Sequence, residues 1–196
     1  GEPEPREDQG AALARKYGVA NRQTWEIPSK DGGAHVQTCG DALTVDGADC
    51  DGCCTDPPYD LEIAAAVTSI FRFAPVAVVL SAQRLTFGLI RAADCRLALV
   101  WRHRNPRRMP NLNMPIMHHA DVLILAKDEK AKTAWTKPRA DYGSVIETQR
   151  EYEMQHGHGK SAELVVEMLA PLPWRTVWDP FLGSGPTVIA ACWSPQ

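Results

Sequence analysis

Long apolar runs are absent from this chain of 196 residues. No run approaches the roughly 20 apolar residues that a membrane-spanning helix needs, so we expect no membrane partner. The chain also lacks an excess of positive charge, because its formal net charge is -3. Any contact with nucleic acid must therefore come from a local patch. No charged segment followed by an apolar one opens the chain, so we expect no secretory signal and a cytoplasmic location.

Regularly spaced cysteine pairs are absent too. The six cysteines are Cys39, Cys50, Cys53, Cys54, Cys95 and Cys192. A chain of this size does not need disulfide staples, so reduced thiols in a cytosolic protein are the simpler interpretation. The spacing Cys50-x-x-Cys53 suggests zinc, but a tetrahedral site needs four ligands and no second pair follows. We expect no metal.

The composition predicts one soluble globular domain with a polar extension. Hydrophobic residues make up 44% and charged residues 23% of the chain, which is an ordinary balance. Residues 1–34 are rich in Glu, Arg, Gly and Pro, and we expect a flexible N-terminal arm there, with a short helix around Ala11–Tyr17. The domain then covers 35–196, with a small insertion around 102–158.

The apolar segments predict an α/β layered fold. Three strands are continuously apolar rather than alternating, which favours a sheet covered on both faces: 76–80, 97–101 and 122–125. Shorter strands are expected at 36–39, 50–55 and 176–178. Helical spacing of apolar residues recurs between strands, at 61–73, 84–93 and 161–169, and Pro186 begins a last helix. Alternating strands and helices are typical of α/β proteins.

A group with distinctive chemistry, Asp56-Pro57-Pro58-Tyr59, follows the strand expected at 50–55. Ligands of open α/β sheets bind beyond the carboxyl ends of the strands. The two prolines fix the backbone and leave their carbonyls as rigid acceptors. Asp56 and the Pro57 carbonyl can each accept one hydrogen of an exocyclic amino group, and Tyr59 can stack on a planar base. The alternative is a simple strand-ending turn.

A second group, residues 179–187, follows the strand expected at 176–178. Its glycines, Gly183 and Gly185, allow backbone to approach a ligand closely. A strand, a glycine-containing turn and a helix N-terminus form a nucleotide-sized pocket. Asp179 at the strand end can take the ammonium of an amino-acid-bearing cofactor. An ordinary turn between a strand and a helix is the alternative.

Together, Asp-Pro-Pro-Tyr and Asp-Pro-Phe-x-Gly-Ser-Gly resemble the motifs of DNA N6-adenine/N4-cytosine amino-methyltransferases. The catalytic motif precedes the cofactor motif, as in the circularly permuted, beta-type subgroup. The resemblance covers roughly residues 36–190. It implies a three-layer, Rossmann-like methyltransferase fold with a mostly parallel central sheet, S-adenosyl-L-methionine as cofactor and DNA as substrate.

The resemblance assigns roles to individual residues. The catalytic residues it implies are Asp56, Pro57, Pro58 and Tyr59. The segment around Asp41 is similar to one that reaches the cofactor's adenine, and 156–161 is similar to the family's His-x-x-x-Lys-Pro element. The implied cofactor-binding residues are Asp41, Lys160, Asp179, Phe181, Gly183, Ser184, Gly185 and Thr187.

Four arginines lie within seven residues in the insertion: Arg102, Arg104, Arg107 and Arg108. On a loop beside the catalytic cleft they are candidates for contacts to DNA phosphates. A solvated loop is the alternative.

The implied reaction is methylation of an amino group on a base that has left the duplex. Within the family, Asp rather than Ser at position 56 favours adenine N6, while cytosine N4 and RNA remain open. Family members continue past the Gly-Ser-Gly helix into a strand whose acidic residue holds the cofactor ribose. The sequence stops at Gln196, so we expect that C-terminal strand to be missing. A catalytically impaired DNA-binding or accessory module is therefore an alternative, and a homodimer or partner chain is expected to cover the exposed sheet edge.

Overall fold

The computed structural model describes residues 23–28, 34–39, 41–81, 83–103, 120–132, 145–148, 160–183 and 185–193. Two compact units divide the chain, residues 1–47 and 48–196. The expected helix around Ala11–Tyr17 lies outside the described residues. Among the described helices, none has the length and apolar character needed to cross a bilayer.

The first unit contains a β-hairpin. Strand β1 (Gln23–Pro28) pairs antiparallel with β2 (Ala34–Cys39), from Gln23 opposite Cys39 to Pro28 opposite Ala34. The strand expected at 36–39 is confirmed. Strand β1 was not predicted, because its short alternation of apolar and polar residues sits within a stretch that is polar overall.

The second unit is built on a six-stranded sheet with the order β7-β5-β6-β4-β3-β8. The strands are β3 (Gly52–Thr55), β4 (Val76–Ser81), β5 (Asp94–His103), β6 (Ala120–Ala126), β7 (Val145–Thr148) and β8 (Val177–Trp178). Neighbours pair in parallel except at β6, which runs antiparallel to both β4 and β5. The prediction of a mostly parallel sheet is confirmed.

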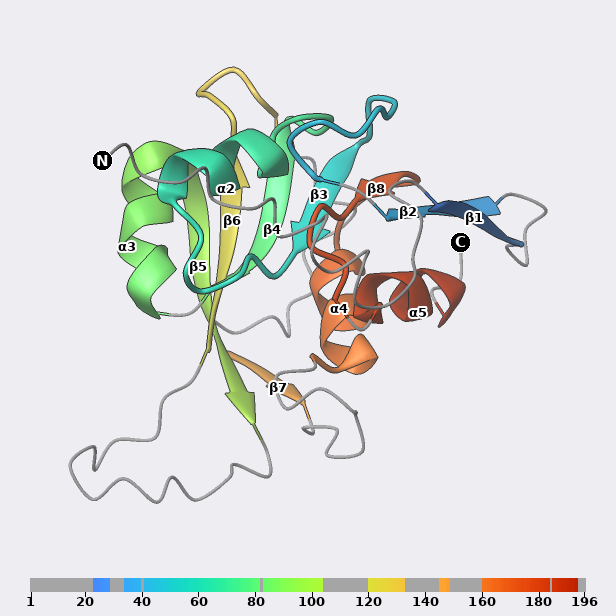
Figure 1. Ribbon diagram of the computed structural model, residues 1–196. Helices are drawn as coiled ribbons and strands as arrows, with labels where there is room; N and C mark the ends of the chain where they lie inside the picture. The colour runs from blue at the N-terminus through green and yellow to red at the C-terminus, as the bar shows by residue number, and fades with distance from the viewer. Residues whose placement is uncertain are drawn as a thin grey trace, which may run out of the picture. The chain divides into compact units, whose positions relative to one another are not determined.

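Helices cover both faces of this sheet, so the unit has three layers (Figure 1). The helices α2 (Ile63–Ile70) and α3 (Gln83–Ala92) lie against one face, and α4 (Ala162–Leu169) and α5 (Pro186–Trp193) lie against the other. The helices expected in this unit are thus confirmed, including the start of α5 at Pro186.

Strand β4 shows why its continuous apolar sequence belongs in the middle layer. Val76, Val78 and Leu80 join the core beneath α4 and α5. Ala77 and Val79 point the other way, into the core beneath α2 and α3. Successive side chains of a strand face opposite sides, so burial on both faces requires an unbroken apolar run.

Two features of the sheet were not predicted. Strand β7 lies in a polar stretch, and a tertiary hydrogen bond secures it: the Trp101 indole N–H donates to Thr148 Oγ1 at 2.9 Å. The reversed direction of β6 was also not predicted, because an apolar run encodes burial and not strand direction.

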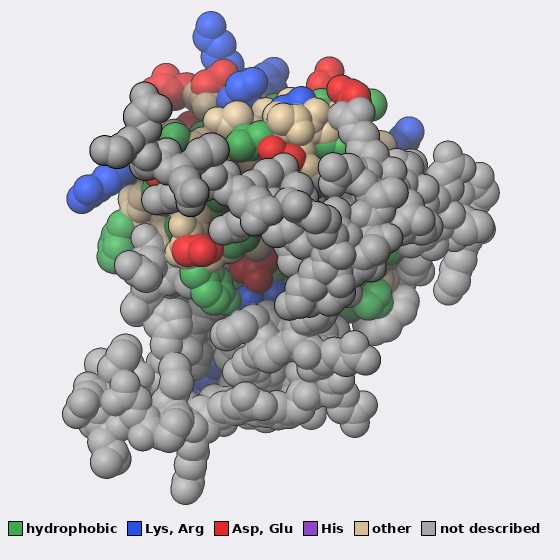
Figure 2. All heavy atoms as spheres, in the orientation of Figure 1, with side chains coloured by type: hydrophobic (Ala, Val, Ile, Leu, Met, Phe, Trp, Pro, Cys, Tyr) green, Lys and Arg blue, Asp and Glu red, His purple; other side chains and the backbone are tan. Residues whose placement is uncertain are grey.

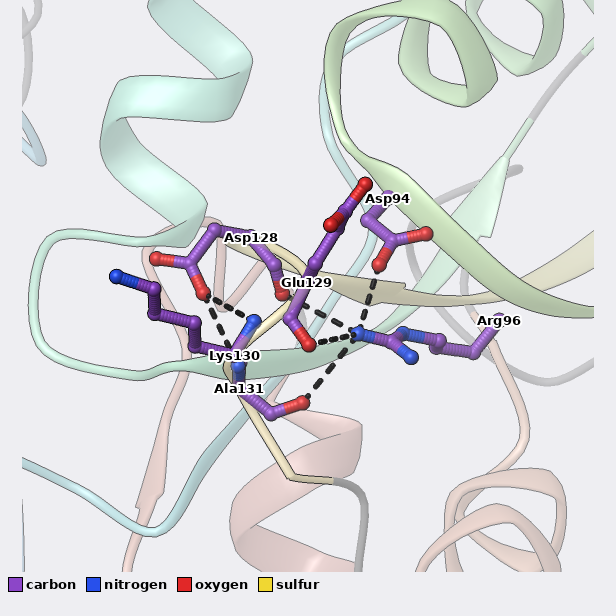
Figure 3. A network of polar contacts seen from close by, with 6 residues as sticks. All are labelled: Asp94, Arg96, Asp128, Glu129, Lys130 and Ala131. Atoms are coloured by element: carbon purple, nitrogen blue, oxygen red, sulfur yellow. Dashed lines mark hydrogen bonds and ion pairs between the residues drawn. The ribbon is translucent and has the colours of Figure 1, made fainter.

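Polar contacts at the surface connect β5 with the turn after β6, at the amino edge of the sheet where β3, β4 and β8 begin. Arg96 lies at a register shift between Cys95 and Leu97 in β5. Its Nη2 forms an ion pair with Asp94 Oδ2 at 2.7 Å and donates to the carbonyls of Asp128 and Glu129 at 3.3 and 3.1 Å (Figure 3). This arginine joins the start of β5 to the turn that follows β6.

Candidate active site

The two motifs singled out in the sequence meet at the carboxyl edge of the sheet. Strands β3 and β8 are parallel neighbours, with Gly52 opposite Val177 and Cys53 opposite Trp178. Asp56 follows β3 and Asp179 follows β8, so both carboxylates leave the sheet at the same edge. They line one pocket.

The pocket is lined by both polar and apolar residues. Its polar lining residues are Thr55, Asp56, Lys160, Asp179 and Thr187. Its apolar lining residues include Leu80, Val165, Phe181, Leu182 and Pro186. Such a mixture suits a ligand with a charged part and a flat apolar part.

Lys160 forms an ion pair inside this pocket. Its Nζ lies 2.6 Å from Asp56 Oδ2 and donates to the Tyr59 hydroxyl at 3.2 Å. The same ammonium lies 5.6 Å from the centroid of the Tyr59 ring. Burial by itself lowers the pKa of Lys160, but the charge of Asp56 and the hydrogen bond to it raise this pKa above its ordinary value. Lys160 is therefore held as a cation.

The remaining residues of the first motif differ in exposure. Pro57 is buried, whereas Tyr59 is 41% exposed. Tyr59 is not among the residues that line the pocket, but an exposed aromatic ring can receive a planar ligand. The motif thus combines a fixed backbone with an accessible stacking surface.

Asp179 is held by three donors from within the chain. The Thr55 hydroxyl donates to its Oδ1 at 2.7 Å, and the Thr187 hydroxyl donates to its Oδ2 at 2.6 Å. The Phe181 backbone N–H also donates to Oδ1, at 3.0 Å. Burial raises the pKa of the Asp179 carboxyl above its ordinary value, although each of these hydrogen bonds lowers it.

The loop between β8 and α5 (residues 179–185) depends on glycine at two positions. Gly183 has φ 55° and Gly185 has φ 83°. Residues other than glycine rarely adopt such backbone angles, and a β-carbon there costs on the order of 1 kcal/mol. At Gly185 the requirement comes from the backbone angle, because a β-carbon would meet no atom within 4 Å.

Some expected site residues are not among those that line the pocket, and others lie outside the described residues. Asp41 belongs to the first unit, where its Oδ1 accepts from the Leu43 N–H at 2.9 Å. Arg102 is exposed and lies 2.9 Å from Glu147 in an ion pair with it. The structure does not describe Ser184, Arg104, Arg107 or Arg108.

The cysteines near the pocket are not activated. Cys53 and Cys54 are buried in β3, and burial raises the pKa of both thiols well above their usual range. No group of three or more potential metal ligands occurs among the described residues. Thiol chemistry at neutral pH therefore has no support at this site.

Two contacts in the site were missed by reasoning from the sequence. Thr55 was read only as the end of a strand, and its hydroxyl holds Asp179. Lys160 was expected on the cofactor side, and its ammonium contacts Asp56 and Tyr59, although it also lines the pocket. Both contacts join residues more than a hundred positions apart, which no local pattern encodes.

Solved structures share this architecture at low sequence identity. The M1.HpyAVI–SAM complex is 21% identical, with a TM-score of 0.59 over 74% of this chain and 77% of that one. TTHA0409 from Thermus thermophilus, an assigned DNA modification methylase complexed with S-adenosyl-L-methionine, is 18% identical. Its TM-score is 0.52 over 78% of this chain and 81% of that one.

A scan against protein-family models and a search of curated proteins both find no match. At these low identities, the likeness to the solved structures is evidence for the fold alone. Together with the sheet and layers described above, it shows that the chain has the Rossmann-like fold of S-adenosylmethionine-dependent methyltransferases.

Proposed function

We propose that this chain is a DNA methyltransferase that uses S-adenosyl-L-methionine and acts on the exocyclic N6 of adenine. The observation that carries the proposal is the placement of Asp56 and Asp179 on one pocket, at the edge where the parallel strands β3 and β8 end. Ligands of open α/β sheets bind at this edge. Both structural neighbours are complexes with S-adenosyl-L-methionine, and TTHA0409 carries the name of a DNA modification methylase, which supports the same assignment.

The residues present fit the cofactor. The acidic part of the lining suits a cofactor that carries positive charge, and the apolar part, which includes Leu80 and Phe181, suits its adenine. The positive φ of Gly183 turns the loop at the pocket wall. When bound, S-adenosyl-L-methionine supplies a methyl group on a positive sulfonium. We assign Thr187 and the loop residues, Ser184 among them, to this half of the site.

The catalytic half of the site orients the target amine. Asp56 and the Pro57 carbonyl accept its two hydrogens, which draws the nitrogen lone pair out of conjugation. Lys160, 2.6 Å from Asp56 Oδ2, fixes the direction of that carboxylate. After methyl transfer the amine carries an extra proton, which Asp56 is placed to accept. Positioning is the main contribution to rate in this scheme.

The target base must leave the duplex to reach this pocket. Tyr59, a residue that is 41% exposed, offers an aromatic ring on which the base can stack. We further propose that the fold is circularly permuted, because β3, which leads into the Asp56 motif, precedes β8, which leads into the Asp179 motif.

We assign contacts to the DNA backbone to the arginine-rich segment that starts at Arg102. Acidic and basic side chains are interspersed over the described part of the face in Figure 2, so no broad basic field draws DNA to it. The exposed ion pair of Arg102 with Glu147 is worth little, and a phosphate can replace Glu147 as the partner of Arg102.

A methyl-transfer assay with product analysis tests the proposal. Duplex DNA is incubated with the chain and cofactor labelled in its methyl group, and is then digested to nucleosides. We expect label in N6-methyladenine. Label in N4-methylcytosine would identify cytosine as the target. In a parallel reaction with RNA, label in the RNA and none in the DNA would identify RNA as the substrate. Normal cofactor and DNA binding without any label would favour a non-catalytic module.

A further inference from the structure

A single carboxylate joins three of the elements that line the pocket. Asp179 follows β8, Thr55 ends β3, and Thr187 lies in the first turn of α5. Both threonine hydroxyls donate to Asp179, at 2.7 and 2.6 Å. Both threonines are buried, with exposed fractions of 2% and 8%. Thr55 also immediately precedes Asp56, so anything that moves Thr55 moves the catalytic carboxylate.

Donors within the chain take up most of the capacity of Asp179 to accept hydrogen bonds. A carboxylate offers about four lone-pair positions. Three are taken by Thr55, Thr187 and the Phe181 N–H. Little capacity is left for Asp179 to be the main ligand of a cofactor ammonium. A partly buried carboxylate retained at such a place points to positioning rather than to stability.

We propose that Asp179 is a positioning residue that locks the β8–α5 loop (residues 179–185) to the catalytic strand β3 through Thr55 and Thr187. The shape of the cofactor pocket and the place of Asp56 are then set by one shared contact. This inference rests on the proposed function and deepens it. The competing explanation is that Asp179 binds the amino group of the cofactor directly.

Two ligands separate these explanations by calorimetric titration. S-adenosylhomocysteine carries the amino-acid part, and methylthioadenosine lacks it. Removing a hydroxyl by Thr55→Val or Thr187→Val should weaken both ligands by about tenfold, because each change disturbs the whole loop. Thr55→Ser and Thr187→Ser keep the hydroxyl and should bind within about twofold of wild type.

A matched control lies at the opposite end of the same two strands. Thr176, just before β8, donates to Asp51 Oδ2 at 3.1 Å, just before β3. Thr176→Val loosens β3 against β8 without touching the loop, and it should leave both affinities within about twofold of wild type. Thermal unfolding of every variant, with and without ligand, shows that each one is folded.

Steady-state rates distinguish the two threonines, because a general loss of structure would not change kcat in one variant and KM in the other. Thr55→Val should lower kcat at saturating cofactor, because Asp56 is its neighbour. Thr187→Val should chiefly raise the KM for cofactor. Threonine variants that bind both ligands as wild type does, or that lose only S-adenosylhomocysteine, would overturn the inference. A wild-type chain that binds neither ligand would overturn the proposed function, and the inference with it.

Discussion

The two edges of the central sheet use aspartate in opposite ways. At the amino edge, Asp51 is exposed, and the backbone N–H groups of Arg175 and Thr176 lower its pKa. At the carboxyl edge, Asp179 joins the same two strands, and burial raises its pKa. The fold favours the charged form of Asp51, whereas burial disfavours the charged form of Asp179.

The comparison separates stability from function. Exposed carboxylates that accept backbone N–H groups stabilise turns and strand starts. Carboxylates taken out of water are seldom kept for stability alone, and shifted pKa values gather at functional sites. We therefore expect substitutions at the carboxyl edge to change activity strongly, and substitutions at the amino edge to change mainly stability.

The largest effect is expected for Lys160→Met. The change leaves Asp56 without the ammonium 2.6 Å away. Breaking such a pair should lower the free energy of unfolding by about 2 kcal/mol and kcat by about a hundredfold. Lys160→Arg keeps the charge and should recover part of both. Urea denaturation and initial rates measure the effects, and full activity of Lys160→Met would remove Lys160 from the site.

The next effect is expected for Gly185→Ala. Its φ of 83° is rarely adopted by alanine, so the substitution should cost about 1 kcal/mol of stability and weaken cofactor binding. A cofactor titration and a thermal melt measure the two effects. Gly47→Ala, in the first unit, is the control. Unchanged cofactor affinity would show that the loop does not need its left-handed turn.

Asp179→Asn should separate stability from function most clearly. The folded-state pKa of Asp179 is raised, so its contribution is most favourable below its ordinary pKa of 3.8 and is lost as the pH rises through the folded value. At pH 7 the charge therefore costs stability. Asparagine should raise the free energy of unfolding by about 1 kcal/mol while weakening cofactor binding. The gain should shrink on acidification toward pH 4, and a stability loss at pH 7 would contradict this assignment.

The smallest effect is expected for Asp51→Asn. The folded-state pKa of Asp51 is lowered, so its stabilisation is present above its ordinary pKa of 3.8 and is lost as the pH falls through the folded value. The side chain is exposed, so the loss at pH 7 should stay below about 1 kcal/mol. Activity should be unchanged, and thermal melts between pH 3 and pH 7 should show a shallower acid decline. A strong loss of activity would erase the contrast between the two edges.

Local patterns predicted the parts of the fold that depend on burial and on strand ends. The apolar runs predicted β4 and β6, and Pro186 predicted the start of α5. The two motifs were predicted at strand ends, and β3 and β8 place them at one edge. Proline and glycine constrain the backbone locally, so their positions can be read from the sequence.

Pairings over long separations could not be predicted in the same way. The bonds from Lys160 to Asp56 and from Thr55 to Asp179 exist only because distant strands and loops meet. Thr148 in β7 accepts a hydrogen bond from Trp101 in β5. The sequence around β7 is polar, so no local pattern predicted this strand. A threonine or a lysine has the same local pattern whether it faces water or a buried carboxylate.

Single-turnover methyl transfer to duplex DNA by Asp56→Ala tests the central claim most directly. Asp60→Ala, at an exposed neighbour of the motif, is the control. The account predicts that Asp56→Ala binds the cofactor but transfers no methyl group, while Asp60→Ala transfers as wild type does. Transfer by Asp56→Ala at the wild-type rate would contradict the account, because the amine would then be oriented by another group.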